Sequence, residues 1–591
     1  MIVRARRVAP AAVLGLIFSV ALACGENRVV VTPPPRDFGP SADAGRCDDR
    51  CSLDGRSVVN CRDELVETCP TDLACGGGRC QPQCAAAAAE GSSNGCEFYL
   101  QSPLLSALNK AQSCYAAYIV NTSTVPVDVE LEYEGQMLDI SKSVYRTESG
   151  AATLTRHSGP VSPGEGVVLF VSDDPASKTS PGSFGHYPCP PGVEAALYYD
   201  FNPKTTLFGS SFHLKTSAPV SAATIFPFGG GSTEMPTATL LLPVATWAKE
   251  NLLINAWSSA VLAPAGVQIV ASEDDTDVTI VPKRDIQDGV GVMGARAGTP
   301  ATYRLKKGQF LQFAQNEELT GSFVTSTKPT STFGVHSCMN VPAYRGPCDI
   351  ANQQIPAYEQ WGSEYVGVGY RPRVGNEHEV MPYRIMAARD GTRLDYDPEV
   401  PVGAPLELNA GEMVPFAAGV GDAFVVRTQD AEHPIYLSAH MTSAGFDYLG
   451  NARDYNGLGD PEFVNVVAAG QYLSSASFFA DPTYAETSLV IVRAKTGGEF
   501  KDVILECLGG PVSGFRPVGT RGEYEFTRVT LSDRRRPGLK SDGKLCYYGA
   551  HHLRSEGAFT ATLWGMDAFA SYAYPSGMAT RKLVTAPLVT K

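Results

Sequence analysis

The sequence predicts an all-β protein of tandem β-sandwich-like modules preceded by a small disulfide-rich module, and three observations support this prediction. From about residue 97 onward, short β-rich runs alternate with turn residues about every eight to twelve positions, as at 277–280 and 310–313. The chain contains 58 glycines and 42 prolines, which favours many turns and little helix. Charged residues make up only 19% of the chain, which argues against a long coiled coil or a disordered polyelectrolyte.

The first 23 residues predict a secretory signal peptide. Their basic start is followed by an apolar stretch over 8–23, which is too short for a comfortable membrane span. Small Ala23 before Cys24 resembles a bacterial lipobox, and by that resemblance Cys24 is lipidated and becomes the first mature residue. Its acyl chains would hold the protein at a bacterial outer membrane or cell surface. The alternative is an ordinary signal that is cleaved nearby and leaves Cys24 as a plain thiol.

Two short segments follow the signal. Residues 24–46 are rich in proline and predict a lipid-anchored tether that is partly extended. Residues 47–96 contain many cysteines and few large apolar side chains, so this module is expected to depend on cross-links rather than on a core of its own.

The cysteine count supports an exported chain. With one of the fifteen cysteines assigned to lipid, an even number remains, and export places the others where disulfides persist. The sequence leaves their connectivity open. A zinc module is the alternative for the early cluster, where close cysteine pairs occur, but no histidine lies within 47–96. The candidate half-cystines are Cys47, Cys51, Cys61, Cys69, Cys75, Cys80, Cys84, Cys96, Cys114, Cys189, Cys338, Cys348, Cys507 and Cys546.

The remaining region, 97–591, carries an internal repeat. Its clearest copies run over 267–337 and 383–438, and looser copies lie before and after them. Prolines at 219, 329 and 434 close three copies about 105 to 110 residues apart, which is the size of a β-sandwich module. A ring or propeller-like arrangement of the repeats is the alternative. The approximate modules are 97–235, 236–345, 346–470 and 471–591.

Two motifs contain residue types that could carry catalysis, but a structural explanation is favoured for each. The G-x-G-x-x-G run at 289–294 is not followed by a good helix and is expected to be a flexible loop. His336, Cys338 and Asp349 could form a thiol nucleophile with its base, yet nearby Cys348 favours a disulfide in an exported chain. We therefore predict no catalytic residue, no metal site and no cofactor.

Three charged motifs could likewise be either binding sites or ordinary structural features. The neighbours in 377–379 would point to opposite faces of a strand and so would not converge on a metal. The acidic run 273–277 is expected to be a solvated turn, with a Ca²⁺ site as the alternative. The basic run 534–536 is expected to be exposed, with partner binding as the alternative.

The run 336–342, followed by Trp361 and Tyr365, resembles the N-terminal domain of the IgG-Fc-binding-protein family. The end of the chain, near 565–577, looks similar as well, and the resemblance covers roughly residues 100–585. It implies an extracellular, non-catalytic binding or cell-surface role. It assigns no binding residue.

These observations predict a cell-surface lipoprotein with a binding or adhesion role and no enzymatic activity. Its partner would be an unknown extracellular protein or glycan, while the net charge of −14 disfavours nucleic acid. One alternative is a surface glycan hydrolase, which would need two carboxylates facing one cleft. The other is a structural envelope component.

Overall fold

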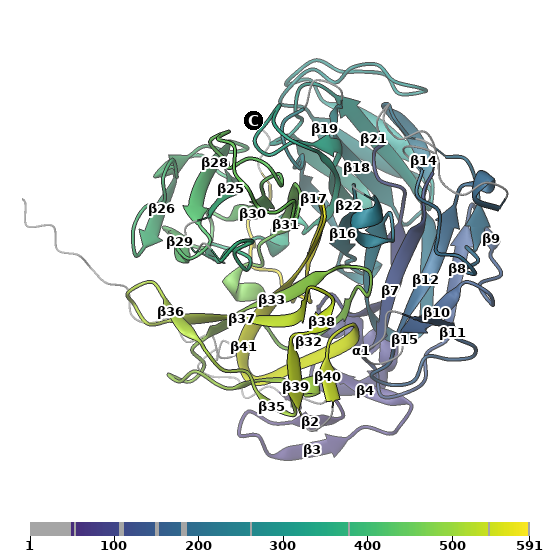
Figure 1. Cartoon of the computed structure of the whole chain (residues 1–591), viewed down its shortest axis with the longest axis vertical. Helices are drawn as coiled ribbons and strands as arrows, with labels where there is room; N and C mark the ends of the chain where they lie inside the picture. Colours follow the sequence, from purple (N-terminus) through teal and green to yellow (C-terminus); the bar gives the residue numbers. More distant parts are fainter. Residues whose placement is uncertain are drawn as a thin grey trace, which may run out of the picture. The chain divides into compact units, whose positions relative to one another are not determined.

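A computed structural model describes residues 49–588, apart from 53–54, 106–111, 148–152, 179–185, 202, 234, 260–262, 376, 378 and 542–543. The fold is nearly all β, which confirms the predicted class (Figure 1). Among the described residues there is one α-helix, α1 (Gln83–Glu90). The signal peptide, Cys24, the tether and Cys47 lie outside the described residues, so their assignments stay predictions.

The N-terminal region is held by disulfides, as predicted. Cys51–Cys75 and Cys69–Cys80 cross-link its strands, and Cys84–Cys96 ties α1 to the strand that follows. Cys61 is also disulfide-bonded. The buried hydrophobic cluster here is small, so the cross-links replace a core. The strands are β1 (Arg50–Cys51), β2 (Ser57–Val59), β3 (Leu65–Thr68), β4 (Leu73–Gly76) and β5 (Arg79–Pro82).

Four larger β-rich units follow and are called the first to fourth repeats. The first repeat is a ten-stranded sheet. Its strands are β6 (Gly95–Leu100), β7 (Tyr115–Asn121), β8 (Val129–Tyr133), β9 (Gln136–Met137), β10 (Val144–Thr147), β11 (Leu154–Arg156), β12 (Gly166–Asp173), β13 (Leu197–Tyr198), β15 (Phe212–Phe226) and β16 (Thr237–Leu240).

The second repeat is an eight-stranded sheet, and it takes one strand from within the chain segment of the first repeat. That strand, β14 (Leu207–Ser210), pairs with the strand at Gln309–Gln315 rather than with its neighbours in sequence. The other strands are β17 (Ala248–Leu252), β18 (Ala265–Ala271), β19 (Thr276–Val281), β20 (Ala301–Leu305), β21 (Gln309–Gln315), β22 (Phe323–Met339) and β23 (Asp349–Ile355).

The third repeat consists of two four-stranded sheets. One contains β24 (Glu364–Gly367), β26 (Thr392–Asp397), β27 (Glu407–Leu408) and β29 (Phe424–Thr428). The other contains β25 (Val380–Ala387), β28 (Met413–Gly419), β30 (Ile435–Met441) and β31 (Glu462–Asn465).

The fourth repeat is a nine-stranded sheet with a separate hairpin of β39 (Leu539–Ser541) and β40 (Lys544–Cys546). The sheet contains β32 (Leu473–Ala480), β33 (Glu486–Ala494), β34 (Val503–Leu505), β35 (Gly510–Pro511), β36 (Arg516–Val518), β37 (Tyr524–Asp533), β38 (Arg536–Pro537), β41 (Gly549–Asp567) and β42 (Ala570–Pro575).

The four repeats share one pairing scheme, which confirms the internal repeat. Each has a long strand, broken into two strands in the third repeat, whose first half pairs with two other strands and whose second half pairs with two more. In the second repeat β22 is that strand; β17 and β19 pair with its first half, and β18 and β23 with its second half. The equivalents of β22 are β15, the pair β29 and β30, and β41.

Prolines mark the corner of the long strands. Pro219 lies in β15 where the register with β6 shifts, and Pro329 lies in β22 where the register with β17 shifts. Pro434 directly precedes β30, where the third long strand is broken in two. Because proline offers no N–H to a ladder, it is tolerated where pairing is interrupted. The prolines that reveal the repeat in the sequence are therefore the places where the chain passes from one half of a repeat to the other.

In each repeat, one of the strands that pair with the second half of the long strand also contacts its equivalents in two other repeats. These four strands form a closed cycle. β16 contacts β23, β23 contacts β31, β31 contacts β42, and β42 contacts β16. The amide of Gln353 in β23 donates to the carbonyl of Ala238 at 2.6 Å and to that of Ala573 at 3.2 Å, so one side chain joins three repeats. This closed cycle corresponds to the ring-like alternative for the arrangement of the repeats.

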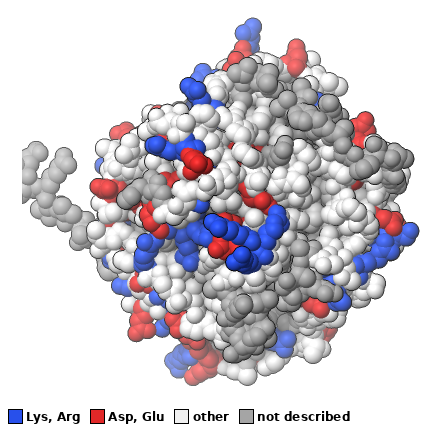
Figure 2. Space-filling model, viewed as in Figure 1, with Lys and Arg blue, Asp and Glu red and all other residues white. Residues whose placement is uncertain are grey.

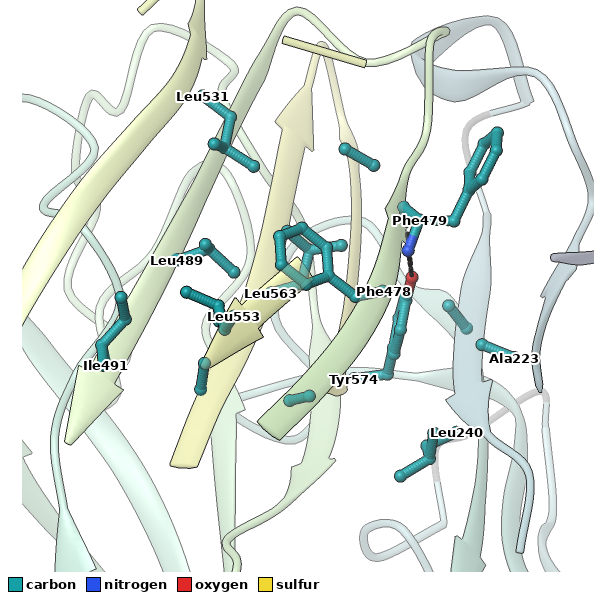
Figure 3. Close-up of a cluster of buried hydrophobic side chains, with 14 of the residues drawn as sticks. Ala223, Leu240, Phe478, Phe479, Leu489, Ile491, Leu531, Leu553, Leu563 and Tyr574 are labelled. Carbon is teal, nitrogen blue, oxygen red and sulfur yellow. Dashed lines mark hydrogen bonds between the residues drawn. The ribbon is translucent and has the colours of Figure 1, made fainter. Parts of the chain in front are cut away.

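The cores are continuous between repeats. In the largest buried cluster, Leu489 and Leu563 of the fourth repeat belong with Ala223 and Leu240 of the first (Figure 3). Within this cluster the backbone N–H of Phe479 donates to the hydroxyl of Tyr574 at 3.2 Å. The same hydroxyl donates in turn to the carbonyl of Phe479. Burial of apolar area therefore holds the last repeat against the first.

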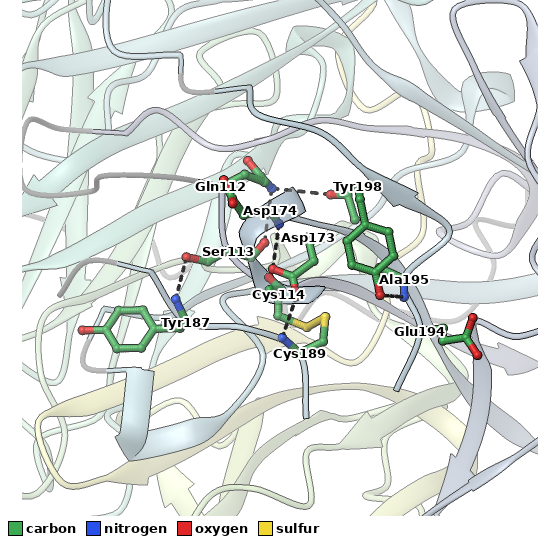
Figure 4. Close-up of a disulfide and its surroundings, with 12 residues drawn as sticks. Gln112, Ser113, Cys114, Asp173, Asp174, Tyr187, Cys189, Glu194, Ala195 and Tyr198 are labelled. Atoms are coloured by element: carbon green, nitrogen blue, oxygen red, sulfur yellow. Dashed lines mark hydrogen bonds between the residues drawn. A yellow bond between two sulfur atoms is a disulfide. The ribbon is translucent and has the colours of Figure 1, made fainter. Parts of the chain in front are cut away.

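Three further disulfides lie in the repeats. Cys114–Cys189 joins buried Cys114 to half-buried Cys189 in the first repeat, where the Asp173 carboxylate accepts hydrogen bonds from the backbone N–H of Cys189 and of Asp174, both at 2.8 Å (Figure 4). The others are Cys338–Cys348 and Cys507–Cys546.

Candidate functional site

The thiol motif is a structural element. Cys338 is bonded to Cys348, as the sequence analysis favours, so it offers no nucleophile. Buried His336 accepts a hydrogen bond from the backbone N–H of Cys338 at Nδ1, 3.0 Å away, and its Nε2 lies 3.2 Å from the carbonyl of Ser258. Burial lowers the pKa of His336 to about 4, so the ring is neutral at physiological pH.

Two of the three charged motifs, 377–379 and 273–277, are engaged in ion pairs. Glu379 is buried against Arg373 at 2.6 Å, whereas Glu377 is exposed and lies 3.2 Å from Arg528; His378 lies outside the described residues. In the acidic turn, Asp277 pairs with Arg304 at 2.7 Å. No group of three metal-ligating side chains converges anywhere in the described part of the chain.

The run at 289–294 is a loop, in which Val290 and Met293 are exposed and Val292 is buried, and its predicted flexibility stays a prediction. Gly289 pairs with Val292 by an isolated bridge, and no helix begins there. The geometry that a dinucleotide needs, with a helix N-terminus facing the pyrophosphate, is thus absent from this described segment.

Three carboxyl groups lie buried beside the central strands. Asp349, Asp460 and Glu462 are each fully buried. Burial raises the pKa of Asp460 to about 7, and burial together with the neighbouring Asp460 and Glu462 raises that of Asp349 well above its ordinary value. Because these acids do not reach solvent, they do not form the open carboxylate pair that a glycan hydrolase needs.

The basic run 534–536 forms an exposed hairpin between β37 and β38. Arg534 and Arg535 occupy its tip with φ of +48° and +59°, positions where glycine or asparagine is preferred. Arg535 is anchored by Nη2 to Asp567 at 2.6 Å and by Nη1 to the carbonyl of Thr483 at 2.8 Å. The anchor holds the tip in this costly conformation, so that its neighbours Arg534 and Arg536 face outward.

This hairpin borders a charged hollow of about 620 Å³, called here the arginine cleft. Arg371 enters it from the loop after β24 and pairs with Glu486. The side chains of Arg534 and Arg536 make no ion pair with any described residue. Figure 2 shows a dense group of Lys and Arg side chains where Figure 1 places β37 and β38. The charged residues that line the cleft are Arg371, Arg373, Glu377, Glu486, Asp533, Arg534 and Arg536.

Arg373 forms the floor of the cleft. It is buried, donates from Nη2 to Thr442 Oγ1 at 2.7 Å, and stacks on the ring of Tyr455 at 3.6 Å. Since its donors are used inside the protein, Arg373 is a rigid support, whereas Arg534 and Arg536 are the cations free for a ligand.

A second hollow of about 580 Å³, the apolar groove, lies close by. Its wall includes Val402, which is 85% exposed, and Leu449, which is 75% exposed. When large aliphatic side chains with such high exposure are grouped together, they are typical of interaction surfaces. The other apolar residues that line the groove include Pro398, Val400, Pro401, Pro517 and Phe526.

Phe526 and Glu377 connect the two hollows. The guanidinium groups of Arg516 and Arg528 lie over the ring of Phe526, at 4.7 and 5.3 Å. Arg528 also pairs with Glu377, which lines the arginine cleft. The cleft and the groove therefore form one surface at the junction of the third and fourth repeats, with an apolar part beside a basic part.

Only part of this surface is predictable from the sequence. The run 534–536 is predicted to be an exposed basic loop, with partner binding as the alternative. Exposed Val402 and Leu449 could not be predicted from the sequence, because scattered apolar residues in a β-rich chain carry no local signal that distinguishes exposed positions from core positions.

The comparisons with known proteins identify the family. The model of the IgGFc binding protein family matches residues 237–565, more than half of the chain, and this range contains the arginine cleft and the apolar groove. No curated protein and no solved structure matches significantly. No helix in the described ranges is long and apolar enough to cross a membrane. The family is one of binding domains, typically extracellular. The chain belongs to the IgGFc binding protein family.

Proposed function

We propose that this chain is a non-catalytic, exported protein that binds an extracellular protein partner through the arginine cleft and the apolar groove. The observation that carries the proposal is that Arg534 and Arg536, which make no ion pair with any described residue, lie on one surface with exposed Val402 and Leu449. Apolar contacts supply affinity and unpaired surface charges supply steering and register, which is the usual division of roles in a protein interface.

The chemistry of the surface defines the partner. The protein carries a net charge of −14, so a local group of arginines is the place where an acidic partner meets least repulsion. The fitting epitope presents apolar side chains flanked by aspartate or glutamate. The Fc fragment of immunoglobulin G is one probe, since the family takes its name from it.

We further propose that Cys24 is lipidated and that the tether at 24–46 presents the four modules at a bacterial cell surface. The lipobox-like Ala23-Cys24 pair supports the anchor, and the abundant disulfides support export. Replacing Cys24 by alanine should release the chain from the membrane fraction. Intact mass measurement of the native protein should show acyl chains on a chain that starts at residue 24.

The binding proposal is tested with an array of extracellular proteins that includes the Fc fragment. The full-length chain is compared with the double variant Arg534→Glu/Arg536→Glu and with the control Arg296→Glu, which changes an arginine that is 86% exposed elsewhere. We expect at least one protein to bind the wild type and the control, and to bind the double variant at least tenfold more weakly. Equal binding by the double variant, or no binding by any chain, would contradict the proposal.

A further inference from the structure

The junction of the first and second repeats contains a cavity of about 540 Å³ that shares no lining residue with the arginine cleft or the apolar groove. It lies between β6, the turn after β8, and the turn between β20 and β21. Its volume falls in the range that small-molecule sites occupy. The residues used below are Tyr99, Ser211 and His213 in its floor and Glu132, Glu134 and Lys307 at its rim.

The floor residues are buried but incompletely hydrogen-bonded. Tyr99 is 1% exposed, and Ser211 and His213 are each 3% exposed. The hydroxyls of Tyr99 and Ser211 and the Nδ1 atom of His213 have no hydrogen-bond partner. A buried polar group without a partner destabilises a fold unless a ligand or water satisfies it, and three such groups line this one cavity.

The floor is also held rigidly. The rings of Tyr99 and His213 stack with centroids 4.3 Å apart and planes 3° apart. Nε2 of His213 lies 2.7 Å from the Glu97 carboxylate, which fixes the ring, and Nδ1 lies 3.5 Å from Glu132 without a hydrogen bond. Such preorganised polar atoms lower the entropy lost when a ligand binds.

The polar groups of the cavity are of mixed type. Burial, together with Glu97, Glu132 and Asp274, raises the pKa of Tyr99, so its hydroxyl stays protonated and can donate. The carboxylates of Glu132 and Glu134 accept hydrogen bonds, whereas the ammonium group of Lys307 donates them. The acids disfavour an anion, and the lysine together with the hydroxyl donors disfavours a simple cation. Vicinal hydroxyl groups, which donate and accept at short spacing, match this set.

We propose that this cavity binds a mono- or disaccharide through its hydroxyl groups, with Tyr99 and Ser211 contacting the sugar. The site is independent of the protein-binding surface, since the two share no residue. The chain would thus bind a glycan at the junction of the first and second repeats and a protein at the junction of the third and fourth.

The test is saturation-transfer NMR on the full-length chain with glucose, galactose, N-acetylglucosamine, maltose and lactose as probes. Tetramethylammonium and inorganic phosphate serve as the cation and anion probes. We expect saturation of at least one sugar, and a dissociation constant about tenfold weaker in Tyr99→Phe and in Ser211→Ala, because each loses one hydrogen bond to the ligand. Both variants remove a buried hydroxyl that has no partner in the protein, so both should fold.

Tyr396→Phe is the matched control. Its hydroxyl is also buried without a partner, but it lies in the third repeat and does not line this cavity. It should leave sugar binding unchanged. The proposal is overturned if no sugar is saturated, if only the cation or the phosphate binds, or if Tyr99→Phe and Ser211→Ala bind sugar as tightly as Tyr396→Phe.

Discussion

At the scale of single residues, the buried carboxyl groups make stability depend on pH. The pKa of Asp460 in the folded protein is about 7, above its ordinary value of 3.8, so folding takes up a proton between these two values. The stabilising contribution is fully present below about pH 4 and is lost as pH rises through about 7. Asp349 and Glu462, whose pKa values are also raised, change stability in the same direction.

We predict that Asp460→Asn loses less stability than the wild type when pH is raised from about 5 to about 8, by a few kcal/mol. Denaturant unfolding at both pH values measures the difference. The neutral histidines His336 and His551 titrate in the opposite direction, since burial lowers the pKa of each to about 4, but they are common to both chains and cancel in the comparison. Equal pH slopes for the two chains would show that Asp460 is not the titrating group.

The hairpin tip gives a second residue-scale prediction. Arg534 has a positive φ that asparagine adopts more readily, so Arg534→Asn should stabilise the fold by up to about 1 kcal/mol. If the arginine is retained for binding, the same substitution should weaken binding of the partner. Thermal unfolding and a binding titration on one preparation measure both effects. A variant that is more stable and binds equally well would remove Arg534 from the interface.

The sequence predicted the exposure of this basic run but not its backbone conformation. Two consecutive arginines do not indicate a tight turn, and the conformation is imposed by distant contacts such as that of Arg535 with Asp567.

Burial of a polar residue is equally hard to predict from a short motif. The Asn-Thr-Ser run that begins at Asn121 fits a glycosylation pattern, which would require an exposed asparagine. The structure buries it, with its amide donating to the carbonyls of Val125 and Val161.

At the scale of elements, each disulfide closes a loop of the chain, and the length of that loop predicts how much the disulfide contributes to the free energy of unfolding. Cys114–Cys189 closes 75 residues and Cys338–Cys348 closes 10. Chain entropy then predicts that replacing the first pair by alanine costs about 4.5 kcal/mol and the second about 2.7 kcal/mol. Denaturant midpoints of the two double variants test the order. A larger loss from the short loop would mean that local packing, not loop closure, dominates.

The sequence predicts best those elements whose signal lies within a short stretch of the chain. The β-rich runs and the closing prolines at 219, 329 and 434 coincide with the long strands and their corners. The position of β14 was not foreseeable, because its pairing with β21 joins residues about 100 apart and leaves no periodic trace in the four residues Leu207–Ser210.

At the scale of the whole molecule, Gln353 tests whether the cycle of repeats is held by specific hydrogen bonds. Gln353→Leu keeps the volume but leaves the carbonyls of Ala238 and Ala573 without this partner, at a cost of about 1 to 3 kcal/mol. Hydrogen exchange should accelerate in β16 and β42. The control Gln287→Leu, at an exposed position, should change neither stability nor exchange. Unchanged exchange in both strands of Gln353→Leu would refute this role.

The contact between the fourth repeat and the first could not be predicted from the sequence. Ala223 and Leu489 each lie in a β-rich run with other apolar residues. Nothing in the sequence around either residue indicates that the two share a core. The sequence therefore indicated four modules, with a ring only as an alternative. The surface at the junction of the third and fourth repeats was hidden for the same reason.

The central claim is that one face, formed by the arginine cleft and the apolar groove, holds a protein partner. The most direct measurement is hydrogen exchange on the full chain with and without the protein selected from the array. We predict protection over 371–377, 398–402 and 533–537, with none over 289–294, a loop of the second repeat that lines neither hollow. Protection confined to other segments, with these three unchanged, would contradict the account.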